Sequence, residues 1–129
     1  MIPVPDSRYN PSSMGQAAGQ ERFVIVAILT LQSGSMETFR EYETRAAVVI
    51  ARHGGAIERT VIEESSGPDK PIREVHVVTF PDIEAFHRYR ADPDVESLSD
   101  MRMASIAHTE LLFGREGPDY MALSKLLGN

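Results

Sequence analysis

The chain has 129 residues, which fits one domain and is short for two independent hydrophobic cores. Its 42% hydrophobic and 25% charged residues exclude a wholly disordered or fibrous chain. The net charge of -6 disfavours nucleic acid and anionic membranes as partners, and the lack of cysteine excludes disulfides, thiolate nucleophiles and thiolate metal sites.

The N-terminal segment, residues 1–22, is rich in proline, serine, glutamine and glycine. Such a composition buries little apolar surface, so we expect a flexible arm outside the core. The segment lacks the basic start and apolar middle of a secretory signal, which predicts a cytoplasmic protein. The longest apolar run, residues 23–31, is about half the ~20 residues that cross a bilayer, so no membrane span is expected.

The first half of the domain predicts a strand, a helix and a second strand. The run FVIVAILTL, residues 23–31, is apolar at nearly every position, which is typical of a central strand covered on both faces. Ser35 is a plausible N-cap for an amphipathic helix that reaches about His53. The Gly-Gly pair that follows ends this helix, and a strand over residues 56 to about 64 comes next.

The second half begins after the loop sequence SSGPDKP, which has strong turn chemistry. It predicts, in order, a strand over 72–80, a helix capped by Asp82, a helix restarted by Asp92-Pro93 that reaches about Ala104, a strand over 106–114 and a short terminal helix over 119–127. The domain is thus expected to cover residues 23–117, with a tail over 118–129.

The predicted order β-α-β-β-α-β indicates a ferredoxin-like α+β fold. Right-handed crossovers place the first and third strands in the middle of one antiparallel sheet, with both helical segments on one face. The first strand is apolar on both faces, so the opposite sheet face would expose an apolar patch. The simplest cover is the same face of a second copy, which predicts a homodimer built as a dimeric α/β barrel.

A family resemblance is carried by three segments: FREYETRAAVVIARHGG, IREVHVVTFPDIEAFHRYRADPDVESL and MRMASIAHTELLFGREG. Over about residues 23–117 they resemble the DUF1330 family of the dimeric α/β-barrel superfamily. Tyr89 stands where that family commonly has tryptophan, and Val95 where it often has tyrosine. The wider superfamily includes cofactor-free monooxygenases, muconolactone isomerases, haem-degrading enzymes and stress proteins, so the resemblance implies a fold and a dimer but no single activity.

Arg102 is the first candidate for a functional side chain. At ~100° per residue it lies about 40° from Leu98, on the apolar face of its predicted helix. Burying an unpaired guanidinium costs several kcal/mol, so its head needs a partner. It either reaches a structural glutamate or the helix end, or it is a bidentate clamp for a substrate carboxylate.

His76 and His108 lie within the third and fourth predicted strands, on either side of the first. Two strand spacings, roughly 10 Å, separate their backbones, so we expect no shared metal in one subunit. Each is either a hydrogen-bonded structural histidine or a general base or ligand contact. Glu110 shares a strand face with His108, so these two side chains could orient each other.

Tyr42 and Tyr89 would form the aromatic walls of any pocket between helices and sheet, unless they are plain core. Arg102 and these two tyrosines are our candidate ligand contacts. Glu43 lies at the edge of the apolar stripe of its helix, and we expect it to be exposed with only its stem packed.

The chain has no GxGxxG, HExxH or GxSxG motif and no phosphate-cradling glycine loop, so no motif dictates a chemistry or calls for a cofactor. Two hypotheses remain. One is a dimer that binds a small organic ligand without catalysis. The other is a cofactor-independent enzyme, monooxygenase- or isomerase-like, that acts on a small carboxylate or aromatic metabolite through Arg102, His108 and Glu110. Convergence of the polar groups on one enclosed space would separate the two.

Overall fold

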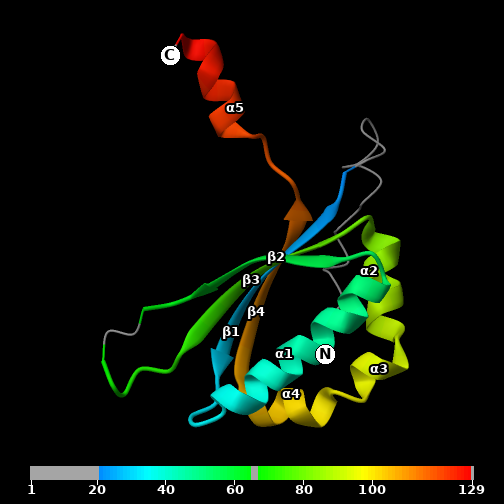
Figure 1. The fold of residues 1–129 in the computed structure, drawn as a ribbon, viewed down its shortest axis with the longest axis vertical. Coiled ribbons are helices and arrows are strands. Elements are labelled where there is room, and N and C mark those ends of the chain that lie inside the picture. The colour runs from blue at the N-terminus through cyan, green and yellow to red at the C-terminus, as the bar shows by residue number, and fades with distance from the viewer. Residues whose placement is uncertain (1–20, 65–66, 129) are drawn as a thin grey trace.

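The computed structural model describes residues 21–64 and 67–128, which form a four-stranded sheet with helices packed against one face (Figure 1). The strands are β1 (Phe23–Leu31), β2 (Ala56–Ile62), β3 (Arg73–Phe80) and β4 (Ile106–Arg115). Their order is β2-β3-β1-β4, and every neighbouring pair is antiparallel. This confirms the predicted ferredoxin-like order, with the first and third strands in the middle.

The helices that pack on the sheet are α1 (Met36–Arg52), α2 (Ile83–Ala91), α3 (Pro93–Glu96) and α4 (Ser99–Ser105). Every second residue of β1 is buried beneath them, while the residues between are only partly buried. Side chains of a strand point alternately to its two faces, so β1 presents one apolar face to the helices. Its other apolar face belongs to the open face of the sheet (Figure 1).

The helical segment after Asp92 differs from the prediction. We expected one helix from Pro93 to about Ala104, but the chain divides it into α3 and α4. At the break, the Ser97 hydroxyl donates a hydrogen bond to the Asp94 carbonyl at 2.8 Å, a side-chain bond of the kind that competes with helix continuation. The break gives α4 its own direction beneath the sheet.

The start of α1 is tied to the end of α4 by one serine. The Ser35 side chain was expected to cap α1, but it makes no capping bond there. Its hydroxyl instead contacts two carbonyl oxygens, that of Gln32 at 2.6 Å and that of Ser105 at 3.0 Å. The Gln32 N–H also donates to the Ser105 carbonyl, so the two helix ends are held together at one end of the sheet.

Gly55, directly after α1, allows a close approach between helix and sheet. A Cβ at this position would lie 2.8 Å from the Phe80 ring and from Ile50, which is closer than packed carbon atoms come. We therefore expect Gly55→Ala to lower the free energy of unfolding by about 1–3 kcal/mol, because the neighbours must shift. Urea denaturation measures this loss. Gly117→Ala, where a Cβ would meet open space, is the control, and equal stability of the two variants would contradict the packing argument.

The core consists of two buried clusters. One surrounds Phe80 and Phe86 beneath α2, and the other surrounds Phe39 beneath the first turns of α1. Leu111 of β4 packs against both clusters. The boundary between them lies under the middle of α1, and the polar residues described below occupy it.

Both ends of the described chain lie beyond the sheet core. Glu21 pairs with Arg115, while Arg22 pairs with Glu58 and Glu116. The rest of the predicted flexible arm lies outside the described residues. After β4, a short helix α5 (Tyr120–Ser124) and a 3-10 turn η2 (Lys125–Leu127) point away from the sheet (Figure 1), and Asp119, the first residue of the predicted terminal helix, is the N-cap of α5.

Candidate functional site

A small cavity lies between the sheet and helices α1, α2 and α4. The centres of water-sized spheres can occupy about 50 Å³ of it. Since one water needs ~10–15 Å³ by this measure, the cavity suits a few waters or a ligand of a few heavy atoms. Apolar residues of both core clusters form most of its wall. The polar side chains that line it are Tyr42, Glu43, His76, Tyr89, Arg102 and Thr109.

Strand periodicity brings the polar residues of the sheet to the helix face. Glu74 and His76 are two residues apart on β3, so both point toward the helices, and both are buried. The register sets His76 beside Ala27 of β1, and Glu74 beside Leu29. Because Ala27 is small, it leaves space in the sheet surface next to the imidazole ring, where the cavity lies.

His76 lies between two carboxylates. Its Nε2 makes a hydrogen-bond contact of 3.0 Å with Glu74 Oε2. Its Nδ1 lies 3.3 Å from Oε2 of Glu43, which reaches down from α1. The side chains of His76, Glu74 and Glu43 are 5%, 10% and 18% exposed, so little water screens the interactions among these three ionisable groups.

Burial is the main reason that the pKa of Glu43 is raised to about 7. The nearby Glu74 carboxylate raises this pKa further, whereas His76 and Arg102 lower it. Burial also raises the pKa of Tyr42 to about 12, so its hydroxyl keeps its proton in the neutral range, and the pKa of Tyr89 is raised for the same reason. Glu43 therefore takes up or releases a proton near neutral pH.

Arg102 reaches the cavity from α4, where its guanidinium contacts uncharged groups. It donates a hydrogen bond to Thr109 Oγ1 at 3.2 Å, and its positive charge is close enough to Tyr42 to oppose the rise in the pKa of that hydroxyl. Among the side chains that the structure describes, no carboxylate comes within 4.0 Å of this guanidinium. Of the two sequence-based alternatives for Arg102, the geometry offers no close structural glutamate and leaves the cation facing the cavity.

The structure brings four of the predicted site residues together and separates two. Tyr42, His76, Tyr89 and Arg102 line the cavity. His108 and Glu110 lie on the open face of the sheet, 3.7 Å from each other and 65% and 58% exposed. The enzyme hypothesis that grouped His108 and Glu110 with Arg102 required all three side chains to line one enclosed space, and they do not. Strand alternation turns Thr109, the residue between them, toward Arg102 instead.

The expectation for Glu43 was wrong, and sequence reasoning missed two further residues. Glu43 was expected to be exposed, but α1 lies so close to β3 that its carboxylate meets His76. Glu74 and Thr109 were not proposed as site residues. The spacing of Glu74, two residues before His76 in one strand, was the signal that could have placed it on the same face.

Two other kinds of site are not supported by the described residues. Within 21–64 and 67–128, no three His, Asp or Glu side chains are arranged to hold a metal ion. The carboxylates beside His76 approach opposite nitrogens of its ring, so they do not converge on one point where an ion could lie. In the same ranges, no helix has the length and apolar character to cross a membrane.

Several solved structures share this fold. A protein of unknown function from Rhodopseudomonas palustris has a TM-score of 0.64 and 18% identity, over 77% of this chain and 85% of that chain. A NIPSNAP family protein from Agrobacterium tumefaciens has a TM-score of 0.58 and 20% identity, over 78% and 92%. SnoaB, a cofactor-independent oxygenase from Streptomyces nogalater, has a TM-score of 0.53 and 20% identity, over 77% and 98%.

At such identities these likenesses establish the ferredoxin-like fold alone. Among curated protein sequences, none is similar enough to this chain to count as a match. The family model for a domain of unknown function, DUF1330, matches residues 24–114. That range spans the four strands, apart from the first residue of β1 and the last of β4, and the helices between them, including each residue that lines the cavity. The chain therefore belongs to the DUF1330 family.

Proposed function

We propose that the cavity binds a small organic carboxylate, with Arg102 as its charge partner. The observation that carries this proposal is the Arg102 guanidinium, which lines the cavity, donates to the neutral Thr109 hydroxyl and has no carboxylate of the described residues within 4.0 Å. A guanidinium presents a planar fork of donors that matches a carboxylate, and a partly buried site strengthens that pairing. The apolar walls would hold the rest of a small ligand.

The size and polarity of the cavity restrict the ligand further. Its volume suits a molecule of roughly half a dozen heavy atoms. Glu43 lines the same cavity as an acidic group, so a ligand with two carboxylates would meet repulsion there. We therefore propose a monocarboxylate. The fold likeness to SnoaB is compatible with small-molecule chemistry in such a pocket, since that protein is a cofactor-independent oxygenase.

Arg102→Met tests the carboxylate proposal, because methionine keeps an apolar stem without the charge. We expect the affinity for pyruvate, measured by calorimetry, to fall at least ~30-fold. Unfolding free energy should change by less than the ~3 kcal/mol of a broken buried ion pair, because no described carboxylate loses its partner. Methyl pyruvate, which lacks the charge, is the ligand control, and Arg88→Met on the exposed side of α2 is the protein control.

Two results would contradict the proposal. If pyruvate, acetate and lactate all fail to bind the wild-type protein, small monocarboxylates are excluded as ligands. If Arg102→Met lowers the free energy of unfolding by about 3 kcal/mol or more, the guanidinium instead belongs to a structural ion pair.

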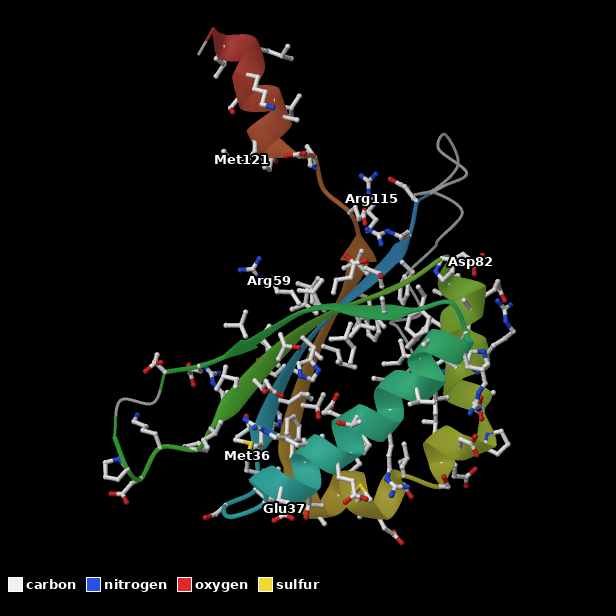
Figure 2. The ribbon with its side chains drawn as sticks, viewed as in Figure 1. Met36, Glu37, Arg59, Asp82, Arg115 and Met121 are labelled. Atoms are coloured by element: carbon white, nitrogen blue, oxygen red, sulfur yellow. The ribbon has the colours of Figure 1, made fainter. Side chains whose placement is uncertain are left out.

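We also propose that the protein is a homodimer through the open face of the sheet. The register places Val77, Val26 and Leu112 side by side across β3, β1 and β4 on this face. Further apolar neighbours on the same face are Val24, Ile28, Val61 and Val75. Arg59 points outward from β2 at the rim (Figure 2). A broad apolar centre with a charged rim is typical of a subunit interface, and self-association covers it without another partner.

Light scattering tests the dimer. Wild-type protein should have about twice the 14.3 kDa mass of the chain at micromolar concentration. Val26→Asp places a charge in the middle of the apolar row and should give a folded monomer, because an unpaired buried charge costs several kcal/mol. Glu41→Asp, on the exposed surface of α1, should remain dimeric. A monomeric wild type would overturn this proposal.

A further inference from the structure

The three ionisable groups in a row, Glu43, His76 and Glu74, have no structural role that explains them. Glu43 and His76 line the cavity, and Glu74 lies behind His76 on the same strand. Replacing a buried charged set with apolar residues of similar size is often neutral or stabilising, so packing alone does not require them. Buried ionisable groups that share a cavity are typical of functional sites.

The contacts of His76 set the direction in which a proton can move. A neutral imidazole has one N–H donor and one acceptor nitrogen. The Glu74 carboxylate, 3.0 Å from Nε2, accepts the N–H and so favours the tautomer with the proton on that nitrogen. The acceptor nitrogen is then Nδ1, which faces Glu43 at 3.3 Å. A proton that arrives on Glu43 thus has an acceptor nitrogen 3.3 Å away, and its transfer would give an imidazolium between two carboxylates.

Among the described residues, the surroundings of His76 contain two carboxylates, one cation and several neutral groups. Its own strand supplies Glu74, and α1 supplies Glu43 together with Tyr42 and the Phe39 ring. From α4, α2 and β4 come Arg102, Tyr89 and Thr109, which share the cavity with the imidazole. Arg102 lowers the pKa of Glu43 through space, yet their charged atoms are not within 4.0 Å of each other. Glu43 and Arg102 line one cavity without pairing with each other, so both remain available to a small molecule bound there.

We propose that this cavity is a proton-transfer site for small 2-oxo acids, in which Glu43 exchanges a proton with carbon 3 while Arg102 holds the carboxylate. This inference rests on the carboxylate binding proposed above. The C3–H bond breaks, its proton forms an O–H bond on Glu43, and its electron pair forms the C2=C3 double bond. The carbonyl π electrons move onto the oxygen, which gives an enolate. Return of a proton to carbon 3 regenerates the 2-oxo acid with that hydrogen exchanged, and protonation of the oxygen instead gives the enol, so no oxidant or reductant is needed.

Each residue has a defined part in this reaction. Glu43 is the general base and His76 takes the proton onward, while Tyr42 donates its hydroxyl proton in a hydrogen bond to the enolate oxygen. Tyr42 can do so because burial raises the pKa of its hydroxyl to about 12, so it keeps its proton, and the neighbouring Arg102 has no acceptor atom that could take that proton in a hydrogen bond. Glu74 is a positioning residue that holds the tautomer of His76. Charge that develops on the substrate oxygen is thus met by preorganised donors.

The test is exchange of the C3 protons of pyruvate and 2-oxobutyrate in D₂O, followed by proton NMR with the full chain. We expect wild-type protein to exchange these protons at least ~100-fold faster than buffer, and E43Q to lose at least ~100-fold of that rate, which is the usual contribution of a general base. E37Q, which changes an exposed glutamate in the first turn of α1, should exchange at the wild-type rate (Figure 2). Y42F is a second variant that keeps the aromatic ring and so preserves the fold, and its exchange rate should fall roughly tenfold.

The positioning role of Glu74 has its own readout. E74Q keeps the shape of the side chain but removes the charge that compensates the imidazolium, so the midpoint of the pH–rate profile should move by at least about half a pH unit. A merely structural role would lower the rate without moving the midpoint. An unmoved midpoint would overturn the part assigned to Glu74.

The outcomes separate this inference from the binding proposal. If calorimetry shows that either 2-oxo acid binds and R102M abolishes the binding, yet no protein-dependent exchange occurs, the proton-transfer inference is overturned while carboxylate binding stands. If neither 2-oxo acid binds, the proton-transfer inference is overturned. Binding of acetate or lactate would then still support the carboxylate proposal, and failure of both to bind would overturn it. Exchange that E43Q leaves intact would assign the base to another group and overturn the inference.

Discussion

Replacing His76 by leucine is expected to destabilise the protein by about 3–5 kcal/mol at pH 8. The imidazole is 4% exposed and contacts two carboxylates, at 3.0 and 3.3 Å. Leucine fills a similar volume but offers neither a proton nor a positive charge. The Glu43 and Glu74 carboxylates would then remain buried close to each other without a compensating group, which is the costly case for a broken buried network.

The cost of His76→Leu should also depend on pH. Because the pKa of Glu43 is about 7, lowering the pH to 5 protonates this carboxyl and removes part of the repulsion. Urea denaturation at the two pH values measures the difference. The matched control is Arg88→Leu, at an exposed position of α2 away from the open sheet face, where we expect a change within about 0.5 kcal/mol. Equal effects of the two substitutions would show that the His76 contacts carry no stability.

The second large effect concerns Glu43→Gln, whose consequence should change with pH. The carboxyl has a pKa of about 7 in the folded protein against an ordinary value of 4.5. Between these values the folded state binds more protons than the unfolded chain, so the unfolding free energy of the wild type falls as the pH rises. The stability that protonated Glu43 contributes is fully present below pH 4.5 and is lost once the pH has passed through 7.

Glutamine does not titrate, so the unfolding free energy of the variant does not fall with pH in this way. The unfolding free energy of Glu43→Gln minus that of the wild type should therefore rise by up to about 3 kcal/mol between pH 4.5 and pH 8, since one pKa unit corresponds to ~1.4 kcal/mol. Any constant offset from the lost His76 contact does not affect this slope. Chemical denaturation across the range measures it, with Glu37→Gln on the exposed side of α1 as the control. A flat difference between wild type and Glu43→Gln would contradict the raised pKa.

The two effects bear on function because they concern the same buried groups. A protein that keeps a destabilising carboxylate above pH 7 gives up folding free energy, a pattern common at sites where a reactive group is held ready. The polar groups lie at the boundary between the two core clusters, where Ala27 and Ala46 leave room that larger side chains would fill. Apolar packing on both sides holds the polar groups in place.

The order of strands and helices was predictable because its signals are local. The apolar run of β1, the three- and four-residue spacing in α1 and the turn residues between elements all act within a few positions along the chain. Handedness then left few ways to connect the elements. The break between α3 and α4 was missed, because the Ser97 hydroxyl bond that marks it is too weak to recognise in a sequence that also supports a continuous helix.

By itself, then, the sequence determined the fold, the two apolar faces of β1, and the position of Arg102 on the apolar side of its helix. Only the tertiary structure decided which polar residues meet. Glu43 and His76 are 33 positions apart on two elements, and their contact depends on how closely α1 approaches β3 and on the register that sets His76 beside the small Ala27. Periodicity assigns a residue to a face, but only packing decides what lies opposite that face, because contacts between elements depend on the shape of every side chain between them.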